Sequence, residues 1–231
     1  MKKEDFLQCC QKHDIDINEH QMQQLETYMH LLQEWNQKMN LTSIDQEEEI
    51  WEKHFLDSIL PFSDMSMNTL CDIGTGAGFP GIPVSIVFPN VQVTLVEPLS
   101  KRCRFLQVVK EQTNGSFEII NERAEDYGKT HRECYDVVTS RAVARLTILL
   151  ELCIPFVKEN GFFVALKGKN GYKELDDAKE ALHILKTEMD HEKSFLIDGA
   201  KHVSFYFKKK EKTPRKYPRV YGQIKKKPLG E

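Results

Sequence analysis

The sequence predicts an α/β fold with a doubly wound, mostly parallel seven-stranded sheet and an N-terminal helical extension. Three observations support this prediction. From Thr69 onward, short apolar segments alternate with amphipathic ones, which is typical of βαβ units. The central apolar segments carry few charges, as expected for strands covered on both faces. A glycine-rich turn follows the first of them, at the place where sheets of this kind bind ligands.

The composition is that of a globular protein with an uneven distribution of charge. Of the 231 residues, 40% are hydrophobic and 29% are charged, which excludes wholesale disorder, collagen-like repeats and coiled coil. The net charge of −3 combines +9 over residues 201–231 with −12 over residues 1–200. A basic end on an acidic body indicates an anionic partner.

The chain is expected to form one compact unit with three parts. Residues 1–62 form a helical cap, with helices predicted over 19–39 and 46–60 from the spacing of their apolar side chains. Residues 63–208 form the alternating α/β domain. Residues 209–231 form a basic tail.

Strands and helices are then expected in alternation. The predicted strands are Thr69–Ile73, Val91–Glu97, Phe117–Ile120, Tyr135–Ser140, Gly161–Lys167, Lys193–Ile197 and Val203–Lys208. The helices between them follow the glycine turn through Phe88 and then occupy Ser100–Thr113, Val143–Val157 and Tyr172–Thr187. This order gives parallel crossovers up to the fifth strand.

The glycine-rich turn is the most informative motif. Asp72 ends the first strand, and Gly74, Gly76 and Gly78 follow at alternate positions. Glycines let the backbone turn sharply and approach a ligand closely. Glu97, at the end of the second strand, offers two acceptor oxygens to ribose hydroxyls.

Two cofactors compete for this turn. Gly76-x-Gly78-x-x-Gly81 formally matches the dinucleotide pattern, with Glu97 as the ribose acceptor. In that register, however, Gly74 already makes the turn and Pro80 lies inside the pattern. S-adenosyl-L-methionine (SAM) has an ammonium that suits Asp72 and no pyrophosphate. The residues therefore favour SAM over NAD, with a purely structural turn as the third possibility.

Short motifs along nearly the whole chain match those of a known protein family. They are Glu34-Trp35-Asn36, Asn40-Leu41-Thr42, His54-Phe55-Leu56-Asp57-Ser58, DIGTGAGFPGIP at 72–83, Lys101-Arg102, Arg123-Ala124-Glu125, DVVTSRAVA at 136–144, Lys167 and Tyr217-Pro218-Arg219. In this order they resemble the bacterial RsmG (GidB) family of small-subunit ribosomal RNA guanine-N7 methyltransferases. The tail departs from the family pattern at Val220–Ile224.

The resemblance implies a Rossmann-like class I SAM-dependent methyltransferase. It implies that Gly74, Phe79, Ala124, Glu125 and Arg141 join Asp72, Gly76, Gly78 and Glu97 in the cofactor site. It also implies methylation of guanine N7 in 16S ribosomal RNA, at position 527 of the 530 loop. N7 carries a lone pair and no proton, so no catalytic acid or base is expected.

The basic tail is predicted to bind RNA. Its lysines and arginines can neutralise phosphates, and Tyr217 and Tyr221 can stack on bases. With basic residues at the rim of the crevice, the predicted RNA-binding set is Arg102, Arg123, Arg145, Lys167, Lys209, Arg215, Lys216, Tyr217, Arg219, Lys225 and Lys226. The expected partner is 16S ribosomal RNA or the small ribosomal subunit.

The remaining expectations concern location and alternatives. No segment reads as a signal peptide or membrane span, and no cysteine spacing fits a metal, so a cytoplasmic, metal-free monomer is expected. His54 and Asp57 are predicted to form a structural hydrogen-bonded pair on one helix face. The alternative functions are an NAD(P)-linked oxidoreductase and a non-catalytic RNA-binding factor.

Overall fold

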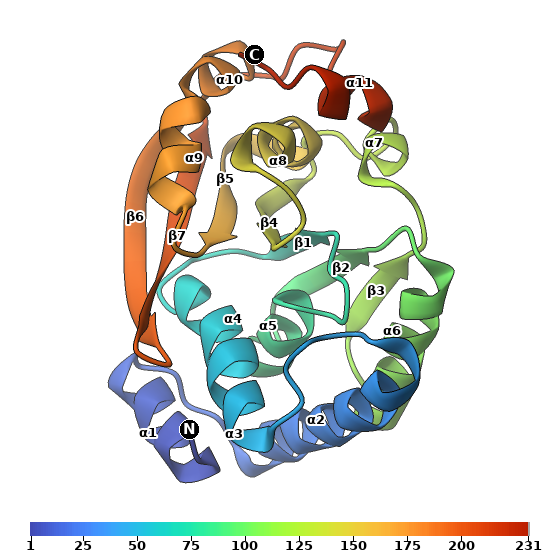
Figure 1. Ribbon diagram of the computed structural model, residues 1–231, viewed down its shortest axis with the longest axis vertical. Coiled ribbons are helices and arrows are strands. Elements are labelled where there is room, and N and C mark those ends of the chain that lie inside the picture. Colours follow the sequence, from blue (N-terminus) through green and yellow to red (C-terminus); the bar gives the residue numbers. More distant parts are fainter. Residues whose placement is uncertain (231) are drawn as a thin grey trace.

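The computed structural model describes residues 1–230, and its centre is one seven-stranded sheet (Figure 1). The strand order is β3-β2-β1-β4-β5-β7-β6, so the order reverses after β1 as doubly wound sheets require. The strands are β1 Thr69–Ile73, β2 Gln92–Val96, β3 Phe117–Ile120, β4 Tyr135–Arg141, β5 Val157–Lys167, β6 Thr187–Ile197 and β7 Ala200–Lys209. The first five pair in parallel, and β7 runs antiparallel to both β5 and β6. The predicted fold class is confirmed.

Side-chain alternation along the strands divides the core between the two faces of the sheet. Leu70, Val137 and Val164 pack on one face, whereas Cys71 and Val138 pack on the other. Helices α1 Lys3–Lys12, α2 Glu19–Met39, α5 Gly81–Val87 and α6 Ser100–Thr113 lie on the first side, and α7 Ala124–Tyr127, α8 Leu146–Cys153, α9 Gly171–Asp177, α10 Lys179–Ile184 and α11 Tyr221–Lys226 on the second (Figure 1). Strands of this kind bury both faces, which explains their continuous apolar runs.

The N-terminal cap packs directly against the glycine-rich turn. Helix α2 has the bounds 19–39 that the spacing of apolar residues predicts. It begins at a capping box formed by Asn18 and Gln21. The Gln21 amide donates to the Ile86 and Val87 carbonyls at 2.9 and 3.1 Å, and the buried Tyr28 hydroxyl donates to the Ala77 carbonyl at 2.6 Å. The cap and the first side of the sheet therefore share one core.

The second cap helix is not one regular α-helix. The predicted segment 46–60 consists of a short α3 Glu47–Glu49, a π-helical stretch Ile50–Leu56, α4 Asp57–Ile59 and a final 3₁₀ turn Leu60–Phe62. A π-helical stretch often occurs at a functional site. His54 lies in this π-helical stretch and Asp57 directly follows it, and both side chains are buried.

Two other predicted elements have different bounds in the structure. The expected helix Tyr172–Thr187 is divided at Ala178 into α9 and α10, and the helical segment ends at Ile184 because β6 already begins at Thr187, six residues before the predicted strand. Strand β5 begins at Val157, so the helix expected to end there stops at Cys153. The register with β7 explains the length of β6: Thr187 pairs with Lys209.

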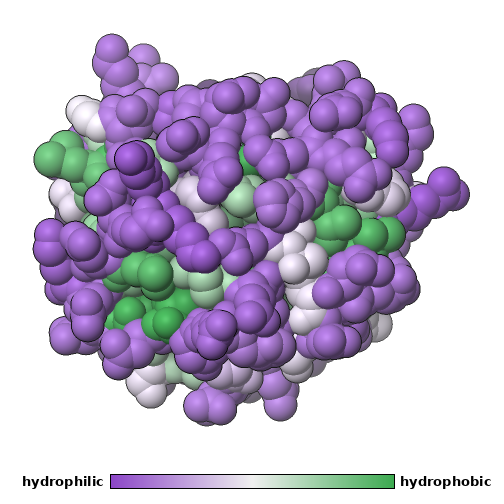
Figure 2. Space-filling view, turned by 90° about the horizontal axis from the view of Figure 1, so that it is seen from below, coloured by the Kyte–Doolittle hydropathy of each residue, from purple (hydrophilic) through white to green (hydrophobic). Residues whose placement is uncertain are grey.

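The molecular surface on the side of the cap is largely hydrophilic, interrupted by small apolar areas (Figure 2). Within residues 1–230, no helix combines the length and the apolar character that a membrane crossing requires.

Candidate functional site

The turn after β1 holds three glycines in the left-handed region of backbone conformation. Gly74, Gly76 and Gly78 have φ of 71°, 63° and 104°. A Cβ on Gly78 would lie 2.4 Å from Ile82 Cδ1, so close packing requires that glycine. A Cβ on Gly76 would meet nothing nearer than 3.9 Å. Of these two glycines, only Gly76 lines the cavity above the turn.

The amides expected in a dinucleotide site already have partners. Gly78 N donates to the Thr75 carbonyl at 2.9 Å, and Gly81 N donates to Asp72 Oδ2 at 2.9 Å. A Cβ on Gly81 would lie 2.2 Å from Leu95 Cδ2, so this glycine also serves internal packing. The pattern Gly76-x-Gly78-x-x-Gly81 therefore does not form a pyrophosphate cradle, which needs free amides.

Asp72 lies beneath the turn and does not line the cavity. Its carboxylate is fully buried, and Oδ2 also accepts from the Thr75 hydroxyl at 2.6 Å. Burial raises the pKa of Asp72 to about 6. The other oxygen, Oδ1, is buried with no hydrogen-bond partner among residues 1–230. Contact between Asp72 and a cofactor ammonium stays a prediction, and the observed role of this carboxylate is to hold the turn.

Glu97 connects the turn to the end of β2. Its Oε2 accepts from Gly76 N at 3.0 Å and its Oε1 from Leu99 N at 2.9 Å. The guanidinium of Arg102 lies 3.5 Å from Oε2. The Glu97 side chain is 1% exposed, yet it lines the cavity. Two carboxylate oxygens have four acceptor positions, so Glu97 keeps capacity for a ligand.

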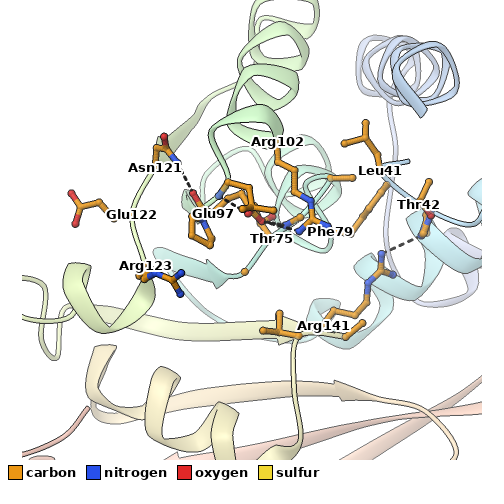
Figure 3. A pocket seen from close by; sticks show the side chains of 18 of the residues that line it. Leu41, Thr42, Thr75, Phe79, Glu97, Arg102, Asn121, Glu122, Arg123 and Arg141 are labelled. Atoms are coloured by element: carbon orange, nitrogen blue, oxygen red, sulfur yellow. Dashed lines mark hydrogen bonds and ion pairs between the residues drawn. The ribbon is translucent and has the colours of Figure 1, made fainter. Parts of the chain in front are cut away.

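A cavity of about 910 Å³ opens at the carboxyl ends of the strands, above Gly76 and Glu97 (Figure 3). Arg102 and Arg123 line it from two sides, and Phe79 and Arg141 lie on its cap side (Figure 3). Its volume is in the range of cofactor sites. The structure therefore brings Gly74, Gly76, Phe79, Glu97 and Arg141 from the predicted cofactor set to one cavity, together with Arg102 and Arg123 from the predicted RNA set.

Ala124 and Glu125 line a smaller adjoining cavity of about 190 Å³. It shares Gly74 and Arg123 with the large cavity. Tyr221, at the start of α11 in the tail, also lines it. The tail therefore reaches the edge of the site.

Arg141 is held by the cap. Its Nη1 donates to Asp57 Oδ2 at 3.0 Å and to the Lys53 carbonyl at 3.2 Å, and its Nη2 donates to His54 Nδ1 at 3.1 Å. The guanidinium also lies 5.0 Å from the centre of the Phe79 ring. The His54 imidazole stacks on the same ring at 4.3 Å.

The predicted His54–Asp57 bond is wrong, because each side chain bonds elsewhere. Asp57 Oδ1 accepts from His202 Nδ1 at 2.8 Å, and this pair raises the pKa of His202. The Arg141 side chain can only donate hydrogen bonds, so His54 Nδ1 must accept and is unprotonated. The proton of the neutral ring is then on Nε2, which donates to the Thr42 hydroxyl at 2.9 Å. Burial, followed by the charge of Arg141, lowers the pKa of His54 to about 3. The imidazole is therefore neutral.

Several residues predicted to bind RNA have structural partners instead. Lys209 is fully buried and donates to Glu133 at 3.0 Å and to the Val157 carbonyl at 2.8 Å. Arg219 donates to the buried Glu151 at 2.8 and 2.6 Å. Tyr217 is 6% exposed. Lys167 lines a neighbouring cavity but donates to Glu174 at 2.8 Å. The exposed members of the set on the tail are Arg215, Lys216, Lys225 and Lys226.

The sequence reasoning did not find Thr42 and His202 as members of this site. Thr42 stands in the motif Asn40-Leu41-Thr42 without a signal of its own, and nothing in the sequence around His202 connects it to Asp57, 145 residues away. Arg145 lies just before α8, at its N-cap. No group of three or more His, Cys, Asp or Glu side chains within residues 1–230 has the arrangement of a metal site.

Comparisons with known proteins give the relatives of the chain and its fold. The chain is 46% identical over 227 residues to the ribosomal RNA small subunit methyltransferase G of Staphylococcus aureus strain JH9, and 47% identical to that of strain Newman, covering 95% of each chain. Among solved structures, TYW2 of M. jannaschii in complex with AdoMet superposes with a TM-score of 0.56 at 14% identity, covering 72% of this chain and 79% of that one. TYW2 of P. horikoshii in complex with MeSAdo superposes with a TM-score of 0.54 at 13% sequence identity, covering 71% of this chain and 64% of that one. These two structures show the same fold. The family model described as rRNA small subunit methyltransferase G (GidB) matches residues 21–203, and the chain belongs to this family.

Proposed function

We propose that the protein transfers a methyl group from SAM to N7 of a guanine in 16S ribosomal RNA, as its family membership implies. Identity of 46% across 95% of the chain to ribosomal RNA small subunit methyltransferase G supports the RNA substrate. By the same resemblance we propose guanine 527 of the 530 loop as the target. A cytoplasmic monomer acting on the RNA or the small subunit fits this role.

The main support for SAM as the cofactor is the pair Gly76 and Glu97, here called the cradle, which are hydrogen-bonded to each other and line the cavity. The missing Cβ of Gly76 leaves open space, and Glu97 holds the Gly76 amide at 3.0 Å while facing the cavity. These residues fit a ligand that has ribose hydroxyls but needs no phosphate cradle. Glu97 would hold the ribose, and Ala124 and Glu125 would border the adenine. The turn itself would face the methionine portion, with Asp72 and Phe79 beneath and beside it.

Bound in this site, SAM would supply an electrophilic methyl group on a positively charged sulfur; the N7 lone pair would form the new C–N bond while the electron pair of the broken S–C bond stays on the sulfur. The protein then has no proton to move. The neutral His54 and the paired Asp57 fit this requirement, because both are engaged in holding Arg141. Catalysis by these residues consists of alignment: the Arg141–Phe79–His54 cluster forms the fixed wall of the cavity against which the reacting atoms are placed.

Two measurements test this function. Calorimetry with SAM and with NAD should show binding of SAM alone, and NAD binding without SAM binding would refute the proposal. Small ribosomal subunits incubated with methyl-labelled SAM and the protein should yield labelled 7-methylguanosine after digestion. SAM binding without any labelled nucleoside would leave a non-catalytic RNA-binding factor as the better description.

A further inference from the structure

Three cavities adjoin one another along the carboxyl ends of the strands. The cofactor cavity shares Thr42, His54, Arg141, Ala142 and Val143 with a second cavity of about 890 Å³. The second shares Gly168, Ala200, His202 and Val203 with a third cavity of about 550 Å³. The three together form a groove, here called the β5–β7 groove, that leads from the cofactor site past the end of β5 to the start of β7.

The second cavity directly adjoins the cofactor cavity, in which the methyl donor would lie. Its wall contains the Arg141–Ala142–Val143 segment, which also borders the cofactor cavity. Polar side chains from different elements line it, among them Asp57 from the cap, Glu174 from α9 and His202 from β7. A volume of this size accommodates a nucleotide. Because the methyl acceptor must lie beside the donor, this cavity suits the target nucleotide.

The third cavity has an exposed aromatic ring at its outer end. Tyr172, at the start of α9, is 42% exposed and lines this cavity. Its hydroxyl donates to Glu192 at 2.6 Å and accepts from Lys201 at 3.0 Å, while its ring meets Phe205 edge to face at 5.6 Å. The ring is thus held in place while part of it stays open to solvent. Such a ring stacks on unpaired bases at little entropic cost.

Two lysines border the same cavity. Lys201 lies 5.2 Å from the centre of the Tyr172 ring. Lys169, in the turn between β5 and α9, is exposed and forms no ion pair within residues 1–230. A free lysine beside an aromatic ring is the combination that binds single-stranded nucleic acid, through phosphate and base respectively. In the tail, by contrast, Tyr217, Lys209 and Arg219 are occupied by internal contacts.

We propose that the RNA strand runs along the β5–β7 groove, with the target nucleotide in the second cavity, a neighbouring base stacked on Tyr172 and backbone phosphates at Lys169 and Lys201. This inference rests on the proposed function for the identity of the RNA. It places the main single-strand contact at α9 and β7, on residues that the sequence motifs do not mark, and assigns the tail a largely structural role.

Two substitutions with matched controls test the groove. Tyr172→Ala should weaken binding of the full chain to 16S ribosomal RNA by about tenfold, the effect of losing one stacked base, whereas Tyr172→Phe should stay within about twofold. Lys169→Ala should reduce the slope of log K against log salt concentration by about 1, the effect of losing one phosphate contact. Lys212 is an exposed lysine of the tail, and Lys212→Ala should leave the slope unchanged. Calorimetric affinity for SAM should not change in any of the four variants, and thermal melts should confirm folding.

Cross-linking separates this inference from the proposed function. With 16S ribosomal RNA that contains 4-thiouridine, irradiation of the wild-type protein should link peptides covering 168–173 and 200–203. Cross-links confined to 212–227, or full RNA affinity in Tyr172→Ala and Lys169→Ala, would overturn the groove assignment. Groove cross-links without any transfer of label to the RNA would support the groove and refute the methyltransferase function.

Discussion

Arg141 Nη1 donates a hydrogen bond to Asp57 Oδ2 across 3.0 Å and so joins the end of β4 to helix α4 of the cap. Their side chains are 15% and 10% exposed. The second Asp57 oxygen accepts from His202, so a single carboxylate connects the cap to two strands of the sheet. The wall shared by the first two cavities depends on this connection.

Asp57→Ala should therefore destabilise the protein strongly. It leaves the guanidinium of Arg141 buried without its charged partner, and breaking a buried pair in this way costs about 3 kcal/mol. The measurement is urea unfolding at pH 7. Asp176→Ala provides the control, because Asp176 pairs with Lys179 at 2.9 Å on the exposed surface of α9 and should contribute little. Equal losses in the two variants would contradict this account.

The contribution of His54 to stability should fall as the pH is lowered below 6.5, whereas Asp72, whose pKa is raised to about 6, acts in the opposite direction below pH 6. His54 has a pKa of about 3 in the folded state and about 6.5 when unfolded, so between these values the unfolded chain binds the additional proton. Protonation thus favours unfolding by up to about 1.4 kcal/mol per pH unit in this window. The free energy of unfolding of wild type and His54→Gln, measured from pH 7 to pH 4, isolates this contribution. Parallel curves for the two proteins would disprove it.

Alanine at two glycines of the turn should have different effects. Gly78→Ala places a Cβ 2.4 Å from Ile82 Cδ1 at a φ of 104°, and the protein should lose several kcal/mol of stability. Gly76→Ala meets no atom within 3.9 Å and should cost only about 1–2 kcal/mol for its left-handed backbone. Its methyl group projects toward the cofactor cavity, so SAM binding should weaken. Thermal melts and calorimetry test both variants, and normal SAM binding by Gly76→Ala would argue against the cradle.

Glu97→Ala should weaken SAM binding by about tenfold or more, because hydrogen bonds to a charged acceptor contribute about 1.5–3 kcal/mol each. The same change also releases the Gly76 and Leu99 amides. Glu122 lines the same cavity and is exposed, so Glu122→Ala is the matched control and should bind SAM normally. If calorimetry gave the same affinity for both variants, Glu97 would not be the ribose acceptor.

Arg219→Ala should act on stability. Glu151 is fully buried, and its carboxylate accepts from the Arg219 backbone amide as well as from the guanidinium. Loss of the side chain leaves a buried carboxylate without its counter-charge, at a cost of about 3 kcal/mol. Arg215→Ala, at an exposed position in the same tail, should unfold at the wild-type urea concentration. An Arg219→Ala protein of normal stability with weakened RNA affinity would instead favour the tail as the RNA site.

The amino-acid sequence was sufficient to predict the order of the strands and helices and the glycine-rich turn after the first strand. Alternation of apolar residues specifies which strand side chains face each layer, so β1 to β4 follow from local pattern, whereas β5 begins four residues before the predicted Gly161. Gly74, Gly76 and Glu97 lie at the ends of adjacent parallel strands, and strand order alone brings them together. The bounds of β6 did not follow, because they are set by pairing with β7 rather than by local propensity.

The internal partners of the charged residues depend on long-range packing. Arg141 and Asp57 are 84 residues apart, and Arg219 and Glu151 are 68 apart. Burial obliges such charges to find a partner, and the partner is fixed by packing of distant elements that no local pattern records. The composition predicts an RNA contact in the tail, and that contact stays a prediction. The packing engages Lys209 and Arg219 internally, leaves four basic residues of the predicted tail set exposed, and leaves Lys169 and Tyr172 exposed beside the groove.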